Sequence, residues 1–363
     1  MTKQHIVIAM VIHSLQAGGM ERVMSELANY FSKLDRVKVH LVLFGRNMNV
    51  FYDLNCSVIV HKPEANFNNR FRAISSLKRL FYVRAAIKQI NPDTVLSFGI
   101  PWNNFVLLAL KRMKYPVFVS DRGSPERRFP FVHELMKRHL YKDANGIIAQ
   151  TKLAKDVTLK VLPLKNIRVI GNPFRPIISN NKYLARENII LSVGRLITTK
   201  HYDRLIHIYS KLIAPGWKLI IIGKNALKQN NFEYLQQMIV DLKLTGRVIL
   251  TGEQKHVEDY YVKSKIFAFT SSVEGFPNVI GEALSAGNPV ISYNCIAGPS
   301  EMINDGENGF LVPVFDDDMF REKLQLLIDN EELRQKMSEK APASIKRFSI
   351  ESIGPQYLDF ILS

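Results

Sequence analysis

The sequence predicts an α/β protein with two doubly wound domains, each built on a parallel sheet that helices cover on both faces. Short runs of β-branched residues alternate with amphipathic segments of helical length along the whole chain. The alternation stops once, at the string GNPFRP of residues 171–176 and the polar residues 179–182, and then restarts. With 363 residues, 47% hydrophobic and 23% charged, the chain is long enough for two globular domains and too apolar to be disordered.

The first domain is expected to span residues 1–172. Residues 6–12 form a buried first strand, which leads through a Gly-Gly turn into an amphipathic helix at 20–34. A further helix is expected at 102–113, and the other strands at 37–44, 94–98, 117–120, 146–150 and 167–170. Residues 173–187 are expected to be a linker.

The second domain is expected to span residues 188–345. Its strands are predicted at 189–193, 218–222, 247–250, 266–270, 289–292 and 310–312, with a helix-length segment between each pair and a helix at 319–328. Residues 346–363 form a C-terminal helix whose amphipathic part, 350–362, could pack on either domain. No apolar run reaches the eighteen or so residues of a membrane span.

Positive charge is concentrated in the first half of the chain. The net charge is +16, and residues 1–180 hold 28 basic and 11 acidic side chains, against 21 and 22 in residues 181–363. The first half is therefore expected to meet an anionic partner: a phospholipid surface, a nucleic acid or a phosphorylated substrate. The two cysteines, Cys56 and Cys295, exclude a disulfide framework and a cysteine-rich zinc site, and they fit a reducing cytoplasm.

Two glycine-containing turns follow predicted strands, where doubly wound folds bind ligands. Gly18 and Gly19 place bare backbone N–H groups at the start of a helix. These groups would bind a phosphate, or the segment is an ordinary tight turn between strand and helix. Gly194 and Arg195 follow a strand of the second domain, and Lys200 comes just before the next helix. Arg195 and Lys200 could together neutralise a diphosphate without a metal, or be two solvated surface cations.

The string EGFPNVIGE at residues 274–282 is the most informative segment, because it places two carboxylates eight positions apart. Glu274 lies in a loop held by glycine and proline, and Asn278 or Val279 opens a helix that contains Glu282. The free N–H groups at the helix start would seat a phosphate, Glu274 would bond a sugar and Glu282 two ribose hydroxyls. The alternative is a pair of solvated helix-end carboxylates.

These strings together resemble the retaining glycosyltransferases of the class called glycosyl transferases group 1, family four, which have the GT-B fold. The strings are EGFPNVIGE, the N-terminal GGMERV, the GRL before Lys200, and GPSE at 298–301. The resemblance implies two Rossmann-like domains facing across a cleft. It also implies a nucleoside-diphosphate sugar as substrate, and no metal or other cofactor is expected.

Carried over position by position, the resemblance implies binding roles for several residues. Gly19 would approach the donor diphosphate from the first domain, and Arg195 and Lys200 would bind it from the second. Glu282 would hold the ribose and Glu274 the donor sugar. The backbone of Phe276, Pro277, Asn278 and Val279 would cradle sugar and phosphate.

The chain departs from the family pattern at two places. Gly223 stands at the nucleotide-side turn, but Lys224 and Asn225 replace the usual second glycine. Many relatives carry a Ser-Glu-His sequence whose histidine touches the transferred sugar, and here Asp121 and Arg122 follow Ser120. Arg122 cannot act as a general base and would contribute hydrogen bonds or charge, while Asp121 could instead belong to a buried ion pair.

Two further features have an ordinary interpretation. The acidic triplet Asp316, Asp317 and Asp318 precedes a helix, so we interpret it as a cap and not as a metal site. Cys295 is expected to be a small buried hydrophobe near the active cleft.

A basic stretch at 69–90 could serve a membrane. Its apolar stripe would pack on the sheet, and its cations would be either solvated or bound to anionic lipid, with Phe67 or Phe71 dipping into the interface. The cations are Arg70, Arg72, Lys78, Arg79, Arg84 and Lys88, and the apolar residues are Phe71, Ile74, Leu77, Phe81 and Ile87.

We therefore expect transfer of a hexose or N-acetylhexosamine from a nucleotide sugar, a UDP-sugar in preference to a GDP-sugar, to a saccharide acceptor. The acceptor is expected to be lipid-linked, in bacterial surface polysaccharide or glycan assembly, at the cytoplasmic face of the inner membrane. The alternatives are a nucleotide-sugar epimerase on the same fold and a basic nucleic-acid-binding protein. The latter would leave Glu274 and Glu282 unexplained, so no nucleic-acid partner is expected.

Overall fold

The computed structural model describes residues 5–45, 49–63, 72–162, 166–174, 176–177, 186–226 and 229–363. The chain divides into two compact units. The first unit contains residues Met1–Pro173 together with Ile350–Ser363, and the second contains Phe174–Ser349.

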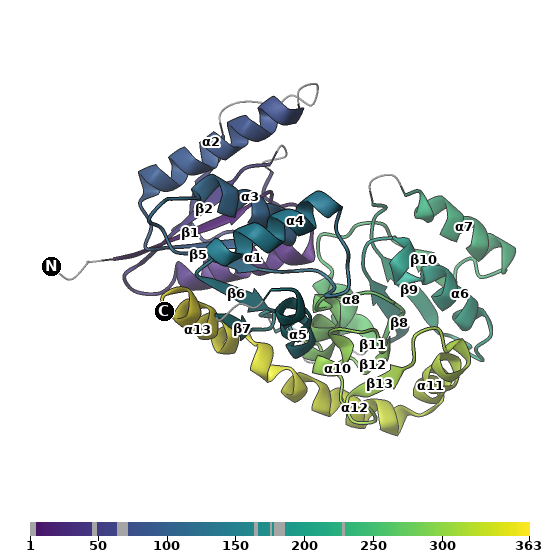
Figure 1. Ribbon diagram of the computed structural model, residues 1–363. Coiled ribbons are helices and arrows are strands. Elements are labelled where there is room, and N and C mark those ends of the chain that lie inside the picture. The colour runs from purple at the N-terminus through teal and green to yellow at the C-terminus, as the bar shows by residue number, and fades with distance from the viewer. Residues whose placement is uncertain are drawn as a thin grey trace. The chain divides into compact units, whose positions relative to one another are not determined.

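The first unit is a parallel sheet with strand order β3-β2-β1-β4-β5-β6-β7. Figure 1 labels β1, β2, β5, β6 and β7 of this sheet. Its strands are β1 Ile6–Ile12, β2 Val37–Leu43, β3 Ile59–His61, β4 Thr94–Phe98, β5 Val117–Ser120, β6 Gly146–Ala149 and β7 Ile167–Val169. Its helices are α1 Gly19–Phe31, α2 Arg72–Ile90, α3 Ile100–Leu110, α4 Phe131–Leu140, α5 Lys152–Val161 and α13 Ile350–Ile361. The doubly wound topology predicted from the alternation is therefore confirmed.

The second unit repeats the same design, with strand order β10-β9-β8-β11-β12-β13. Its strands are β8 Glu187–Val193, β9 Lys218–Ile222, β10 Val248–Leu250, β11 Ser264–Phe269, β12 Val290–Tyr293 and β13 Gly309–Val312. Its helices are α6 Tyr202–Ser210, α7 Asn231–Asp241, α8 Glu258–Lys263, α9 Asn278–Ser285, α10 Pro299–Met302, α11 Asp317–Asp329 and α12 Glu331–Ser344.

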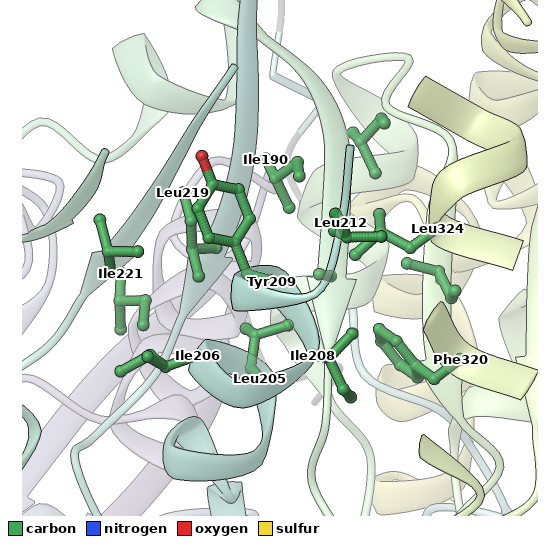
Figure 2. Packing of buried hydrophobic residues seen from close by; sticks show 14 of the residues in the cluster. Ile190, Leu205, Ile206, Ile208, Tyr209, Leu212, Leu219, Ile221, Phe320 and Leu324 are labelled. Atoms are coloured by element: carbon green, nitrogen blue, oxygen red, sulfur yellow. The ribbon is translucent and has the colours of Figure 1, made fainter. Parts of the chain in front are cut away.

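Both sheets are buried on two faces, which explains why the central strands are continuous apolar runs. In β4 and β5 every residue is buried. In the second unit, side chains of β8, β9, α6 and α11 pack against one another, as Figure 2 shows for Ile190, Leu219, Leu205 and Phe320. The strand order reverses between β1 and β4 in the first sheet and between β8 and β11 in the second. These two switch points are where doubly wound sheets place ligand sites.

The C-terminal helix α13 packs in the first unit. A Cβ on Gly354 would lie 2.4 Å from the Tyr30 ring of α1, and Phe360 contacts Phe118 of β5 edge to face at 5.3 Å. Helix α13 therefore covers the same side of the first sheet as α1.

The first unit contains one strand that the sequence pattern did not predict, and one expectation about α2 was wrong. Strand β3 was missed, because Ile59–His61 is only three residues long and has no alternating pattern. The apolar stripe of α2 was expected to pack on the sheet, but Ile74, Leu77 and Phe81 are exposed. Ile87 of that stripe is buried, and Phe71 lies outside the described residues. Phe67 and Arg70, which were expected to meet the membrane, also lie outside them.

Candidate functional site

The predicted residues of the second unit gather at its switch point. Strands β8 and β11 are hydrogen-bonded neighbours, and the loops that follow them carry Arg195 and Lys200 on one side and Glu274 on the other. Parallel strands end at the same edge of the sheet, so residues 74 positions apart in the sequence meet there.

Hydrogen bonds tie the two loops together. The Thr270 hydroxyl donates to the Lys200 carbonyl at 2.8 Å, and the Ser271 hydroxyl and the Ser272 amide donate to the Thr199 carbonyl at 3.1 and 3.0 Å. His201 adopts a left-handed conformation, with φ of 50°, between the short 3-10 turn Thr198–Lys200 and α6. The backbone around Lys200 is therefore held against the end of β11.

Lys200 and Glu274 form an ion pair at this edge. The Lys200 Nζ lies 2.5 Å from the Glu274 Oε1, and each side chain is only 15% exposed. The ammonium also lies 4.7 Å from the centre of the Phe269 ring. The resemblance assigned these two residues to different groups of the donor, and in the structure they are direct partners.

Glu282 is a buried carboxylate on α9. Helix α9 begins at Asn278, directly after Pro277, as predicted. Glu282 is 5% exposed, and its Oε2 accepts a hydrogen bond of 3.0 Å from the hydroxyl of Tyr261 on α8. Sequence reasoning missed Tyr261, because an isolated tyrosine in a short helix has no distinguishing pattern.

Glycine and aromatic contacts hold the loop before α9. Gly298 has φ of 102°, and a Cβ there would lie 2.1 Å from the Pro277 Cδ. The Phe276 side chain is buried and stacks on Phe174, whose ring lies 2.4 Å from a Cβ built on Gly281. The backbone of residues 276–279 is therefore fixed from both sides, and Phe276 can offer a ligand only its backbone.

Two loops approach each other so closely at residue 223 that a side chain larger than that of glycine would not fit. A Cβ at this position would lie 1.8 Å from the carbonyl oxygen of Gly194. The next residue, Lys224, pairs with Glu253 at 2.6 Å. Arg195 is exposed, and its side chain makes no hydrogen bond or ion pair with the residues that the structure describes.

Cys295 lies close enough to sense the charge of Glu274. Burial, and then the Glu274 carboxylate, raises the pKa of the Cys295 thiol to about 12. The thiol therefore stays protonated and buried, as expected for a small hydrophobic residue and not for a nucleophile.

The Gly-Gly turn of the first unit is tightly held. The Gly18 amide donates to the Tyr52 hydroxyl at 3.0 Å, which donates to the Gly18 carbonyl at 2.9 Å. A Cβ on Gly18 would lie 2.2 Å from the Glu21 Oε2. Gly19 is the first residue of α1, so its backbone lies at the amino end of a helix.

Asp121 forms the buried ion pair that was one of its two interpretations. Its Oδ2 accepts from the Lys137 Nζ at 2.6 Å, and its Oδ1 accepts from the Tyr141 hydroxyl at 2.6 Å and from Asn103 at 3.2 Å. Burial, and then the Asp121 charge, raises the pKa of Tyr141, which keeps its donor proton.

Arg122 has spare donors. Its Nη1 donates to the Tyr357 hydroxyl at 2.9 Å, and its guanidinium lies over the Phe98 ring at 4.2 Å. Its buried Nε and Nη2 have no hydrogen-bond partner among the described residues. Of this neighbouring pair, Arg122 is the one that keeps donors without a hydrogen-bond partner among the described residues, and both of these nitrogens are shielded from solvent.

We predict that Asp121→Asn lowers the free energy of unfolding by about 3 kcal/mol, the scale for removing one partner of a buried ion pair. Urea unfolding measures the change. The matched control is Asp359→Asn, which breaks the ion pair of Asp359 with Arg168, whose side chains are 74% and 43% exposed. Equal losses in the two variants would contradict a structural role specific to Asp121.

The acidic triplet caps α11, as interpreted from the sequence. The Asp316 carboxylate accepts a hydrogen bond of 3.0 Å from the Met319 amide. Asp317 pairs with Arg204 at 2.8 Å. These carboxylates are occupied at a helix end, on residues that follow β13 and not on the loops after β8 and β11.

Two family models match the chain in succession. The model described as Glycosyltransferase Family 4 matches residues 17–176, and the model described as Glycosyl transferases group 1 matches residues 175–344. The two matches meet where the first unit ends and the second begins.

Two curated relatives are similar over almost their whole length. The amylovoran biosynthesis glycosyltransferase AmsD of Erwinia amylovora is 28% identical over 355 residues, which cover 95% of this chain and 96% of the relative. An alpha-1,4-N-acetyl-D-galactosaminyltransferase of Campylobacter jejuni, named for a PP-undecaprenol-linked saccharide, is 27% identical over 98% of each chain.

Solved structures share the fold of this chain. The Anabaena protein Alr3699/HepE in complex with UDP-glucose has a TM-score of 0.82 at 18% identity and covers 98% of this chain and 99% of its own. The lipopolysaccharide outer core galactosyltransferase WaaB in its apo form has a TM-score of 0.73 at 22% identity, with the same coverage. At these identities the likeness shows the fold alone, two Rossmann-like domains of the GT-B type.

Proposed function

Since the chain is a glycosyltransferase of the glycosyl transferases group 1 family, we propose that it moves a hexose or N-acetylhexosamine from a UDP-sugar to a saccharide acceptor with retention of configuration. The observation that carries the proposal is the cluster at the switch point of the second sheet. Lys200 follows β8, and Glu274 and helix α9 follow the neighbouring strand β11. Lys200 and Glu274 form an ion pair there, and α9 contains Glu282.

In this proposal each group at the switch point has one part of the donor to bind. The backbone N–H groups at the amino end of α9 seat a phosphate, and the buried Glu282 accepts hydrogen bonds from the ribose hydroxyls. Glu274 bonds the donor sugar. Lys200 is already positioned by Glu274, and the exposed Arg195 is available to join it on the diphosphate.

We further propose that the two cations stabilise the departing diphosphate, so that no metal is needed for this step. The acceptor then attacks from the face that the diphosphate leaves, and a diphosphate oxygen takes the acceptor proton. This route needs no nucleophilic carboxylate, in agreement with the engagement of Glu274 by Lys200.

The acceptor is proposed to be a saccharide on a lipid diphosphate at the cytoplasmic face of the inner membrane, in bacterial polysaccharide or glycan assembly. The Campylobacter jejuni relative is named for such a lipid-linked saccharide, and the Erwinia amylovora relative for amylovoran biosynthesis. Gly19 at the start of α1 and the guanidinium of Arg122 are the groups of the first unit proposed to meet the substrates. Among the described residues, no helix has both the length and the apolar character that a bilayer crossing requires.

A thermal-shift panel of UDP-, GDP- and ADP-sugars tests the proposal. A UDP-sugar is expected to raise the melting temperature most, because it is the proposed donor and should bind with the lowest Kd. A ligand at about 100 times its Kd adds about 2.7 kcal/mol to the free energy of unfolding. Release of UDP that depends on a saccharide acceptor would then separate transfer from epimerisation. Salt-dependent binding of DNA or RNA, with no response to any nucleotide sugar, would overturn the proposal.

A further inference from the structure

The outward face of α2 carries apolar side chains that the described residues of the first unit leave largely exposed. Ile74, Leu77 and Phe81 are 53%, 53% and 59% exposed, and their spacing of three and four residues puts them on one side of the helix. The opposite side of α2 is the one that joins the core, through Val83 and Ile87. The helix is therefore apolar on two sides, and among the described residues the side with Val83 and Ile87 is the one that packs in the core.

Helix α4 repeats this feature. Phe131, Val132 and Leu135 are 78%, 63% and 44% exposed, and Leu140 is the buried residue of this helix. Helix α3 packs between α2 and α4 and exposes Leu108 at 41%. We call the exposed set of Ile74, Leu77, Phe81, Leu108, Phe131, Val132 and Leu135 the apolar surface.

The three helices lie on one face of the sheet. The connections from β3 to β4, β4 to β5 and β5 to β6 step in the same direction along the strand order. Right-handed crossovers then put α2, α3 and α4 on a common face, opposite α1 and α13, and Figure 1 shows α3 between α2 and α4.

Exposed cations accompany the apolar residues. Lys78 and Lys88 lie on the same side of α2 as Ile74 and Phe81, and Arg138 lies on the same side of α4 as Phe131. Further exposed cations lie in the loops at the ends of these helices: Lys111, Arg112 and Lys114 follow α3, and Arg127 and Arg128 precede α4. Between residues 72 and 143, the exposed acidic residues are Glu126 and Asp143, and Asp143 pairs with Lys111 at 3.7 Å.

We propose that the apolar surface docks on a bilayer that contains anionic phospholipid. Bulky apolar side chains with cations beside them suit the boundary between headgroups and acyl chains, where the cations meet lipid phosphates. A second copy of the chain fits less well, because a two-fold contact would press these cations against themselves. The proposal adds a membrane-docking surface to the lipid-linked acceptor of the proposed function. The role of this surface in sugar transfer rests on that proposed function.

Vesicle sedimentation of the full chain tests the proposal. The protein is expected to sediment with phosphatidylglycerol vesicles at low salt and to dissociate from them at high salt. It is not expected to sediment with vesicles of pure phosphatidylcholine. The triple variant Phe131→Ser/Val132→Ser/Leu135→Ser should lower the vesicle-bound to free ratio about tenfold or more. Arg127→Glu/Arg128→Glu should lower it at low salt and weaken the salt dependence.

Ile213→Ser is the matched control, because Ile213 is 79% exposed in the second unit. It should bind vesicles as the unmodified chain does. Equal vesicle binding by the triple variant and this control would overturn the proposal. The proposal would also be overturned if the unmodified chain were a dimer and the triple variant a monomer that still binds vesicles normally.

Stabilisation by UDP-sugars is measured on the same variants and should be unchanged. Lipid binding that persists while no nucleotide sugar binds would defeat the proposed transferase and leave the membrane surface standing. The reverse result would defeat only the membrane surface.

Discussion

Replacing Glu274 with alanine is expected to abolish sugar transfer, with a fall in rate of about 10³-fold or more. A carboxylate that bonds the donor sugar near the bond to be broken should matter more in the transition state than in the ground state. Glu274 stands in a loop that hydrogen bonds tie to residues 199–201, so the loop itself does not depend on this side chain. The rate of acceptor-dependent UDP release measures the effect.

Folding has to be separated from chemistry in this test. The alanine variant leaves the Lys200 ammonium without its partner at a site only 15% exposed, and this alone can lower stability. Glu274→Gln keeps the size of the side chain and an oxygen for Lys200, and it should lose transfer while unfolding near the normal urea concentration. Glu332→Ala, which breaks an exposed pair with Lys336, is the control and should transfer normally. Near-normal turnover of Glu274→Gln would end the assignment of this residue.

Replacing Lys200 or Arg195 with methionine is expected to slow transfer by about 10²–10³-fold, the scale measured when one preorganised group that stabilises a developing charge is removed. Because Lys200 is bound to Glu274, the two should act as one unit. The double variant Lys200→Met/Glu274→Gln should then lose little more than the worse single variant. Lys336→Met is the matched control on the exposed pair.

Metal independence is the second half of this prediction. Transfer should persist in EDTA, because the two cations are proposed to supply the charge that a metal would otherwise bring. Loss of activity in EDTA with recovery on adding Mn²⁺ would contradict it. Such a result would return attention to Asp316 and Asp318, although the Asp316 carboxylate is engaged with the Met319 amide.

The fold could be predicted because buried parallel strands have a distinctive composition. The expected strands at 6–12, 94–98, 117–120 and 218–222 coincide with β1, β4, β5 and β9, since each is a short, mostly apolar run between polar turns. Helix ends were predicted less closely. The helix expected at 102–113 begins at Ile100 and ends at Leu110 as α3, because Gly99 and Pro101 start it earlier than the apolar pattern suggests.

Of the candidate site, the sequence could supply the residues but not all their partners. The carboxylates of EGFPNVIGE and the cations Arg195 and Lys200 stand out by position after predicted strands. The contact of Tyr261 with Glu282 joins two helices, and no local pattern records it. The contact of Gly223 with the Gly194 carbonyl likewise depends on two loops that meet at the sheet edge.

By itself, the sequence determined the two-unit α/β plan, the excess positive charge of the first half and the loop-to-helix placement of Glu274 and Glu282, since all three follow from local composition and spacing. Only the tertiary structure decided that Lys200 pairs with Glu274, that Asp121 pairs with Lys137, and that α13 joins the first unit. It also decided that Ile74, Leu77 and Phe81 face outward. The physical reason is that periodicity tells which residues share a face of a helix, whereas burial depends on which other element covers that face.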